Sequence, residues 1–136
     1  MLEEIPIMEK EIVFTGNAMR AIGPYNQAVK VGNFVFTAGQ LGISPQTNKL
    51  MEGLDAQAAM TFNNMNEVLH AAGAHRKDLV KINIYLKDMK DFEKINELMK
   101  AWLKGTAHPA RTCIQAVELP KGCLFLMDAV AFIQDK

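Results

Sequence analysis

The sequence has little cysteine, no excess charge and no long apolar segment, and each of these absences argues against a class of protein. Two cysteines in 136 residues are too few for a disulfide-stabilised scaffold, so we expect reduced thiols and a cytoplasmic protein. The 15 basic and 15 acidic residues balance, which removes the attraction toward nucleic acid or anionic membranes. No apolar run approaches the roughly 20 residues of a membrane span, so no membrane association is expected.

Familiar catalytic and metal-binding motifs are also missing. The chain has no GxSxG nucleophile elbow, no phosphate-binding P-loop and no dinucleotide-binding fingerprint. His70, His75 and His108 are not spaced to gather a zinc tetrahedron with Cys113 and Cys123. A metal site is therefore not expected.

The composition is that of a single globular domain. The apolar fraction is 49% and the charged fraction 22%, and a chain of this length can bury one core. The opening stretch, "MLEEIPIMEKEIVF", carries four glutamates and neither a basic segment nor a long apolar one, so we expect no signal or transit peptide. We predict one domain over residues 1–136.

The first half of the sequence carries signals for a short strand, a hairpin and a long helix. Gly32 and Asn33 tolerate positive φ and suit the tight turn of a hairpin. Further on, apolar residues recur close to helical spacing up to Gly73, which stands where a C-terminal cap belongs. The predicted elements are strands at 11–14, 28–31 and 34–38, a loop at 42–53 and a helix at 54–72.

The second half alternates strand and helix patterns. A period of two predicts a half-buried strand, with Val80 assigned to the buried face together with three later apolar residues. Asp88 or Asp91 can cap a second helix that ends near Gly105. We expect the last two strands, which carry the two cysteines, to pair across a turn. The predicted elements are strands at 79–86, 111–117 and 123–132 and a helix whose apolar stripe covers 92–102.

This order of elements predicts an α+β fold, a mixed β-sheet with two helices packed on one face. The last strand, "CLFLMDAVAF", is apolar on both of its faces. In a two-layer domain only one face of the sheet is covered by helices. We therefore predict that the open face packs on another subunit.

Arg111 is the strongest candidate for a functional residue. It follows a proline in "HPARTCIQ" and heads a strand that we expect to be buried, where an unpaired charge would be costly. Its guanidinium presents two parallel donors that suit a ligand carboxylate. The alternative is a structural salt bridge to Asp128 or Glu118, which the local sequence slightly favours.

Four further residues are candidates, each with a structural alternative. Tyr25 follows a Gly-Pro bend that would turn its side chain into a groove, or it is a loop aromatic. Gly39 ends a strand where a ligand or another backbone can approach closely, or it marks a bulge. Asn96 lies within the second helix, where solvent exposure is the ordinary state. Cys113 is more often a small buried hydrophobe than a nucleophile.

Four segments in order resemble the signatures of the Rid family of reactive intermediate deaminases, also known as the YjgF or endoribonuclease L-PSP family. They are "AIGPYNQAV", "VFTAGQLG", "AAGAHRKDLVKINIYLKDMKDFEKIN" and "PARTCIQAVELPKG", and the resemblance covers about residues 13–132. It implies a chorismate-mutase-like subunit in a homotrimer whose sheets face a central barrel-like core. It also implies ligand sites in clefts between neighbouring chains.

The resemblance further implies an activity and its residues. Arg111 would bind the carboxylate of a 2-imino or 2-enamino acid, such as 2-iminobutanoate or 2-iminopropanoate, which is hydrolysed to a 2-oxo acid and ammonia. Arg111 and Cys113 would be catalytic, with Gly39 and Cys113 offering backbone groups, Tyr25 lining the cleft from the adjacent chain and Asn96 supporting the site. Positioning the carboxylate and one water can supply most of the acceleration, so no metal or organic cofactor is required.

Two positions depart from the family's pattern and keep an alternative open. Ala38 stands where active members commonly have serine, and Leu126 stands where they have a water-orienting glutamate. Asp128 lies on the same face as Leu126 but some 6 to 7 Å further along the strand. A non-catalytic trimer that binds 2-oxo or imino acids through Arg111 is therefore the alternative to a deaminase. Ribonuclease activity rests on a family label alone, because no acid–base pair or basic groove supports it.

Overall fold

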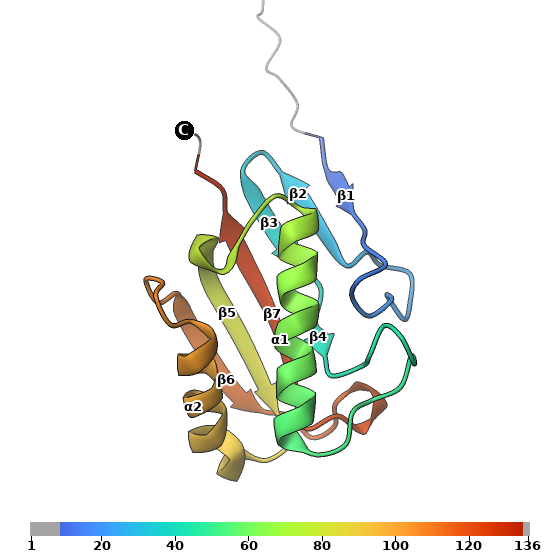
Figure 1. Cartoon of the computed structure of the whole chain (residues 1–136), viewed down its shortest axis with the longest axis vertical. Coiled ribbons are helices and arrows are strands. Elements are labelled where there is room, and N and C mark those ends of the chain that lie inside the picture. Colours follow the sequence, from blue (N-terminus) through green and yellow to red (C-terminus); the bar gives the residue numbers. More distant parts are fainter. Residues whose placement is uncertain (1–8, 135–136) are drawn as a thin grey trace, which may run out of the picture.

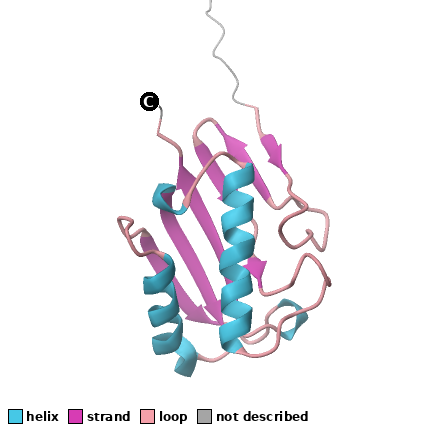
Figure 2. Ribbon diagram, in the orientation of Figure 1, coloured by secondary structure: helices cyan, strands magenta, loops and turns pink. Residues whose placement is uncertain are grey.

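The computed structural model describes residues 9–134, so part of the N-terminal stretch considered above lies outside the described residues. Within them the chain forms a mixed seven-stranded sheet with two α-helices on one of its faces, as predicted (Figures 1 and 2). The sheet order is β1-β2-β3-β7-β5-β6, and the short β4 pairs with β7. The strands are β1 (Glu11–Val13), β2 (Ala28–Val31), β3 (Phe34–Thr37), β4 (Gln40–Leu41), β5 (Leu79–Leu86), β6 (Ala110–Gln115) and β7 (Phe125–Phe132); the helices are α1 (Leu54–Ala71) and α2 (Phe92–Trp102).

The locally encoded elements form close to where the sequence places them. Gly32 has a φ of 58° in the turn between β2 and β3, and Gly73, with a φ of 85°, follows the end of α1. Asp88 accepts a hydrogen bond from the Lys90 N–H at 3.0 Å and so caps a short 3₁₀ turn that leads into α2. Asp91 makes no such side-chain cap. The hairpin and both helices are therefore confirmed.

Val80 corrects the predicted pattern of β5. Its side chain is 45% exposed, whereas that of Leu79 is only 4% exposed. The register against β7 shifts between Leu79 and Lys81, so one extra residue interrupts the alternation and turns Val80 away from the core. The other buried apolar positions of this strand, Ile82, Ile84 and Leu86, lie on the core side as expected.

The expected pairing of the last two strands is wrong. β5 lies between them, parallel to β6 and antiparallel to β7. The β5–α2–β6 segment is a parallel crossover, which leaves the opposite edge of β5 to β7. As a result β6 lies at the end of the sheet and most of its residues are exposed, so Arg111 heads an exposed edge strand and not a buried one.

The core fills the space between the sheet and the helices. Residues of β7 alternate as predicted: those facing the helices are buried, and those facing away are only partly covered. The open face also carries Phe34 and Phe36, each 43% exposed. One face of the sheet is thus uncovered in the single chain, and exposed apolar side chains lie on it beside polar ones such as Asn83 and Asp128.

A buried amide joins α1 to the segment around β4. The Asn64 side chain, fully buried, donates to the carbonyl oxygens of Leu41 and Ile43 at 2.9 Å each and accepts from the Met19 N–H at 3.2 Å. Gly42 lies so close to the same helix that a Cβ there would be 2.6 Å from the Cα of Gln57. These contacts fix β4, and with it the backbone at Gly39, against the helix layer.

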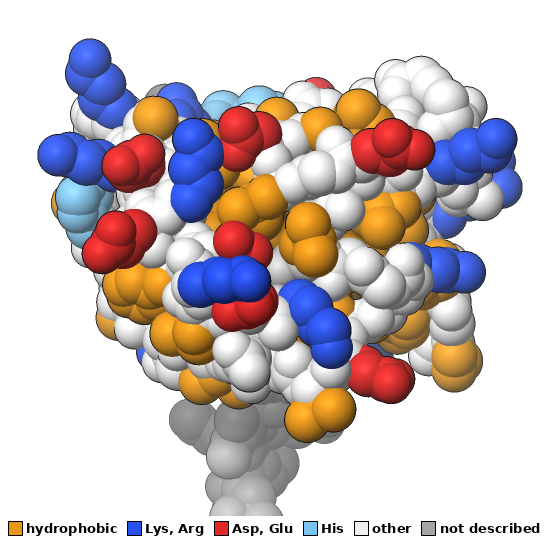
Figure 3. Space-filling view, turned by 90° about the horizontal axis from the view of Figure 1, so that it is seen from below, with side chains coloured by type: hydrophobic (Ala, Val, Ile, Leu, Met, Phe, Trp, Pro, Cys, Tyr) orange, Lys and Arg blue, Asp and Glu red, His pale blue; other side chains and the backbone are white. Residues whose placement is uncertain are grey.

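At the end of the molecule where both helices begin, neither positive nor negative charge predominates on the surface. Figure 3 shows this end, with acidic and basic side chains interspersed among hydrophobic ones. The balance agrees with the equal numbers of acidic and basic residues in the sequence. Among residues 9–134, no helix is both long enough and apolar enough to cross a bilayer.

Candidate functional site

Arg111 projects from β6 toward α2. It pairs with Ile82, whose side chain is buried against the helices, so the Arg111 side chain leaves the strand on the helical side. Its guanidinium carbon lies 5.5 Å from the centre of the Phe92 ring, a cation–π contact that holds the head group beside the helix. Packing against Phe92 therefore positions the Arg111 guanidinium.

Arg111 has no ion pair among residues 9–134, where the ion pairs are Lys90–Asp88 and Lys94–Asp55. The salt-bridge alternative to Asp128 or Glu118 is therefore wrong. Asp128 lies on the other face of the sheet, where it accepts a hydrogen bond from the Asn83 amide at 2.8 Å. Because side chains alternate between the two faces of a sheet, Asp128 and Arg111 lie on opposite faces. The Arg111 guanidinium is therefore available to a ligand.

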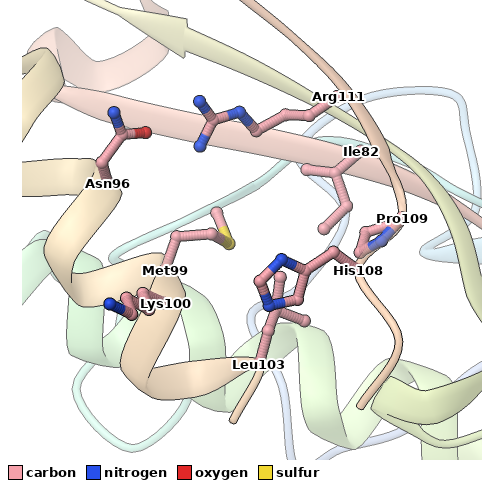
Figure 4. A pocket seen from close by; sticks show the side chains of 8 residues that line it. All are labelled: Ile82, Asn96, Met99, Lys100, Leu103, His108, Pro109 and Arg111. Carbon is pink, nitrogen blue, oxygen red and sulfur yellow. The ribbon is translucent and has the colours of Figure 1, made fainter.

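A cavity of about 310 Å³ opens beside Arg111, between α2 and the start of β6. The Asn96 amide points toward the guanidinium across one end of this cavity (Figure 4). Asn96 Oδ1 is buried and has no hydrogen-bond partner among the described residues, although an unpaired buried acceptor costs about 1–3 kcal/mol. A ligand donor would satisfy it. The lining residues are Ile82, Asn96, Met99, Lys100, Leu103, His108, Pro109 and Arg111.

Tyr25 and Gly39 lie at a second hollow, of about 460 Å³, together with Leu126 and Asp128. Tyr25 Oη accepts the Ile22 N–H at 3.1 Å, which fixes the ring at the hollow. A Cβ at Gly39 would lie 2.9 Å from Leu126 Cδ2, so the Leu126 side chain lies directly over the Gly39 backbone. A larger residue at this position would have to displace the Leu126 side chain.

The single chain does not bring the five predicted site residues together. Arg111, Asn96 and Cys113 lie on the helical side of the sheet, because Cys113 pairs with the buried Ile84. Tyr25 and Gly39 lie at the other hollow, which Leu126 and Asp128 line from the open face of β7. One chain therefore presents these residues at two separate hollows.

Comparisons with known proteins identify the family. The family model described as Endoribonuclease L-PSP matches residues 15–133. The chain belongs to the Rid family, also called the YjgF or L-PSP family. A RutC family protein of Pyrococcus abyssi is 43% identical over 126 residues, which is 92% of this chain and 98% of that protein.

Two further Rid relatives bear on function and fold. A protein of Dermatophagoides farinae named 2-iminobutanoate/2-iminopropanoate deaminase is 38% identical over 126 residues, covering 92% of this chain and 98% of its own length. A crystal structure of E. coli TdcF with bound serine has a TM-score of 0.88 and 34% identity, and the match covers 91% of this chain and 99% of that one. The α+β fold predicted above is that of this Rid structure.

Lys100 and His108 line the Arg111 cavity of this Rid protein, and the sequence did not single them out for it. Lys100 follows Asn96 by four residues, which places both on one side of α2. His108 precedes Arg111 by three residues. The helical spacing was a usable signal for Lys100, whereas His108 enters the cavity only because the chain turns into β6 at Pro109. In residues 9–134 no group of three or more His, Cys, Asp or Glu could hold a metal ion.

Cys113 lies half-buried in β6 beside Arg111. Burial raises the pKa of its thiol, and the Arg111 charge opposes this rise only in part. A raised pKa keeps the thiol protonated at neutral pH, and the protonated thiol is a poor nucleophile. In this Rid protein the raised pKa thus argues against a role for the Cys113 sulfur as a nucleophile.

Alkylation should report this state of Cys113. Because its pKa is raised, the reaction with iodoacetamide should be slower at pH 7 than that of N-acetylcysteine, and should accelerate only as the pH rises above the ordinary pKa of a thiol. Peptide mass spectrometry separates Cys113 from the fully buried Cys123. Rapid labelling at pH 7 would contradict the prediction, since it requires a thiolate.

Proposed function

We propose that the protein hydrolyses reactive 2-imino or 2-enamino acids, such as 2-iminobutanoate or 2-iminopropanoate, to 2-oxo acids and ammonia. The observation that carries the proposal is the Arg111 guanidinium, which has no carboxylate partner among residues 9–134 and lines a cavity with Asn96. The name of the Dermatophagoides farinae relative supports the same reaction. The Arg111 guanidinium supports a substrate with a carboxylate, because its two parallel donors suit that group.

Hydrolysis of an imine requires little chemistry from the side chains of the protein. A protonated imine carbon is already electrophilic, so water adds to it, the nitrogen takes up a proton and ammonia leaves as the carbonyl forms. Arg111 binds the carboxylate through its two parallel donors and fixes the imine beside Asn96. Holding the imine in place for attack by water lowers the entropic cost of bringing the two reactants together. No covalent intermediate with Cys113 is needed, in keeping with its raised pKa.

We further propose that the working site is completed in a homotrimer. The uncovered face of the sheet, with Phe34 and Phe36 exposed, favours packing of the open sheet faces around a central core. Tyr25 and Gly39 of one chain then adjoin the Arg111 cavity of the next, which joins the two hollows. Light scattering that gave the mass of a single 15.1 kDa chain would contradict this assembly.

A second candidate function is binding of 2-oxo or imino acids without hydrolysis. Leu126 favours it, because a hydrocarbon side chain covers Gly39 where a carboxylate would orient the attacking water. Ala38 adds no hydroxyl to the same segment. Asp128 carries a carboxylate at the same hollow, but that carboxylate already accepts a hydrogen bond from Asn83.

A trapping assay distinguishes the two candidates. Threonine dehydratase generates 2-iminobutanoate, semicarbazide traps the imine, and a catalytic amount of this protein should reduce the trapped product because hydrolysis competes with trapping. Unchanged trapping together with saturable heat on titration with 2-oxobutanoate would favour the binding candidate. Unchanged trapping without such heat would contradict both.

Leu126→Glu should accelerate hydrolysis in the same assay by about tenfold or more, because a positioned general base contributes roughly 100-fold or more where geometry is ideal. Leu126→Gln is the matched control, since it has nearly the same shape but cannot accept a proton from water. Equal rates in wild type and Leu126→Glu would show that hydrolysis does not depend on a carboxylate at this position.

A further inference from the structure

We propose that the Arg111 site takes imino acids with two carboxylates, the imines of short 2-oxo dicarboxylic acids, with Lys100 and His108 binding the second carboxylate. This inference rests on the proposed function, because it specifies the substrate class of the same cavity. It adds two binding residues to Arg111 and Asn96.

The charge around the cavity is one-sided. Among residues 9–134, the ionisable residues that line it are Lys100, His108 and Arg111, which are all basic, and none of the lining residues is acidic. This occurs in a chain whose acidic and basic residues are equal in number. A single carboxylate would use the two parallel donors of Arg111, and it would leave Lys100 without a counter-charge and the ring N–H of His108 without an acceptor.

The lining residues are arranged for a ligand with two anionic ends. In Figure 4, Arg111 and Asn96 lie together at one end of the cavity, and His108 approaches from the other side of the Met99 side chain. Lys100 projects from the next turn of α2 beyond Asn96. The space between them, about 310 Å³, accommodates a four- or five-carbon chain.

A second observation points to a ligand at this place. Asn96 Oδ1 is a buried acceptor without a partner among the described residues, and the Asn96 amide lies beside the Arg111 guanidinium. The N–H of a bound imine is a donor that suits it. A buried acceptor without a partner is not accounted for by solvation of exposed basic side chains, and it points to a bound donor.

The chemistry of an imino acid with two carboxylates limits which reactions can produce it. Imines of 2-oxo dicarboxylic acids form when an acidic amino acid is oxidised at its α-carbon, or when an acidic amino acid with a leaving group on its β-carbon loses that group by elimination and releases an enamine. The protein would then act directly after such an enzyme, and its products would be a 2-oxo dicarboxylic acid and ammonia.

Calorimetry with two stable product analogues tests the proposal on the full chain. 2-Oxoglutarate and 2-oxopentanoate share five carbons and the 2-oxo acid group, and differ by a carboxylate in place of a methyl. At about 0.1 M salt, where exposed charges are partly screened, wild type should bind 2-oxoglutarate about fivefold or more tightly, as expected for two partly exposed charge pairs. In Lys100→Gln/His108→Phe this ratio should fall to about one, while the affinity for 2-oxopentanoate is unchanged.

Controls separate this inference from the proposed function. Lys104→Gln removes a nearby lysine that does not line the cavity and should keep the wild-type ratio. Equal affinity of wild type for the two acids, or a ratio that survives the double substitution, would overturn the dicarboxylate inference and leave the proposed function intact. Undiminished binding of 2-oxopentanoate to Arg111→Ala would instead overturn the proposed function.

Discussion

Replacing Arg111 with alanine should lower the rate of imine hydrolysis by about 100-fold. A bidentate, charge-assisted contact with a carboxylate is worth about 3 kcal/mol when both donors are used, and about 1.4 kcal/mol corresponds to a factor of ten. Because Arg111 lies on an exposed strand without an ion pair among residues 9–134, its removal leaves no buried charge unpaired. The loss should therefore appear in activity and not in stability.

The trapping assay measures this loss, and thermal unfolding checks stability. Arg111→Lys is the conservative control: it keeps the charge but not the parallel donors, so it should recover only part of the rate. Lys104→Ala removes a cation outside the cavity and should behave as wild type. Equal rates for wild type and Arg111→Ala would refute a site centred on this guanidinium.

Asn64→Leu should lower the free energy of unfolding by about 3 to 5 kcal/mol. The substitution leaves two carbonyl oxygens and one N–H, those of Leu41, Ile43 and Met19, without their buried partner. Each orphaned group costs about 1–3 kcal/mol, and leucine gains some apolar burial in return. Denaturant unfolding at a fixed protein concentration measures the change, because assembly would make stability depend on concentration.

Asn63→Leu is the matched control for this substitution. Asn63 precedes Asn64 in α1, but its side chain is exposed. The same chemical change there should alter stability by less than about 0.5 kcal/mol. If both variants lost the same stability, the effect would come from helix propensity and not from the hydrogen bonds of Asn64.

The sequence predicts well what neighbouring residues decide. The turn at Gly32, the end of α1 before Gly73 and the apolar stripe of α2 depend on local backbone preferences and on helical spacing. Each lies within a residue or two of its predicted place. β4, with two residues, is too short to leave a periodic signal.

Pairing between distant strands is what the sequence could not supply. The turn between β6 and β7 has the residues of a hairpin, yet the parallel β5–α2–β6 crossover places β5 between the two strands. The misassigned Val80 has a related cause, because the shift that exposes it is a property of the register between β5 and β7.

The same limit applies to the candidate site. The motif around Arg111 identified the cation, but whether Asp128 could neutralise it depended on which faces the two strands present. Arg111 pairs with Ile82 and Asp128 with Asn83, neighbours on β5 that point to opposite sides. The spacing of His108 argues against a metal site and gives no other role for this residue. Only the folded chain places it at the cavity with Arg111.

The position of β6 at the end of the sheet has a consequence for handling the protein. Within residues 9–134 this strand pairs on one side only, with β5, and it carries Ile114 about half exposed at 49%. A strand edge with free backbone groups and apolar side chains recruits further strands and promotes aggregation. Mild denaturation should therefore favour precipitation, because it would separate the chains of the proposed homotrimer, and separated chains present this strand edge unpaired.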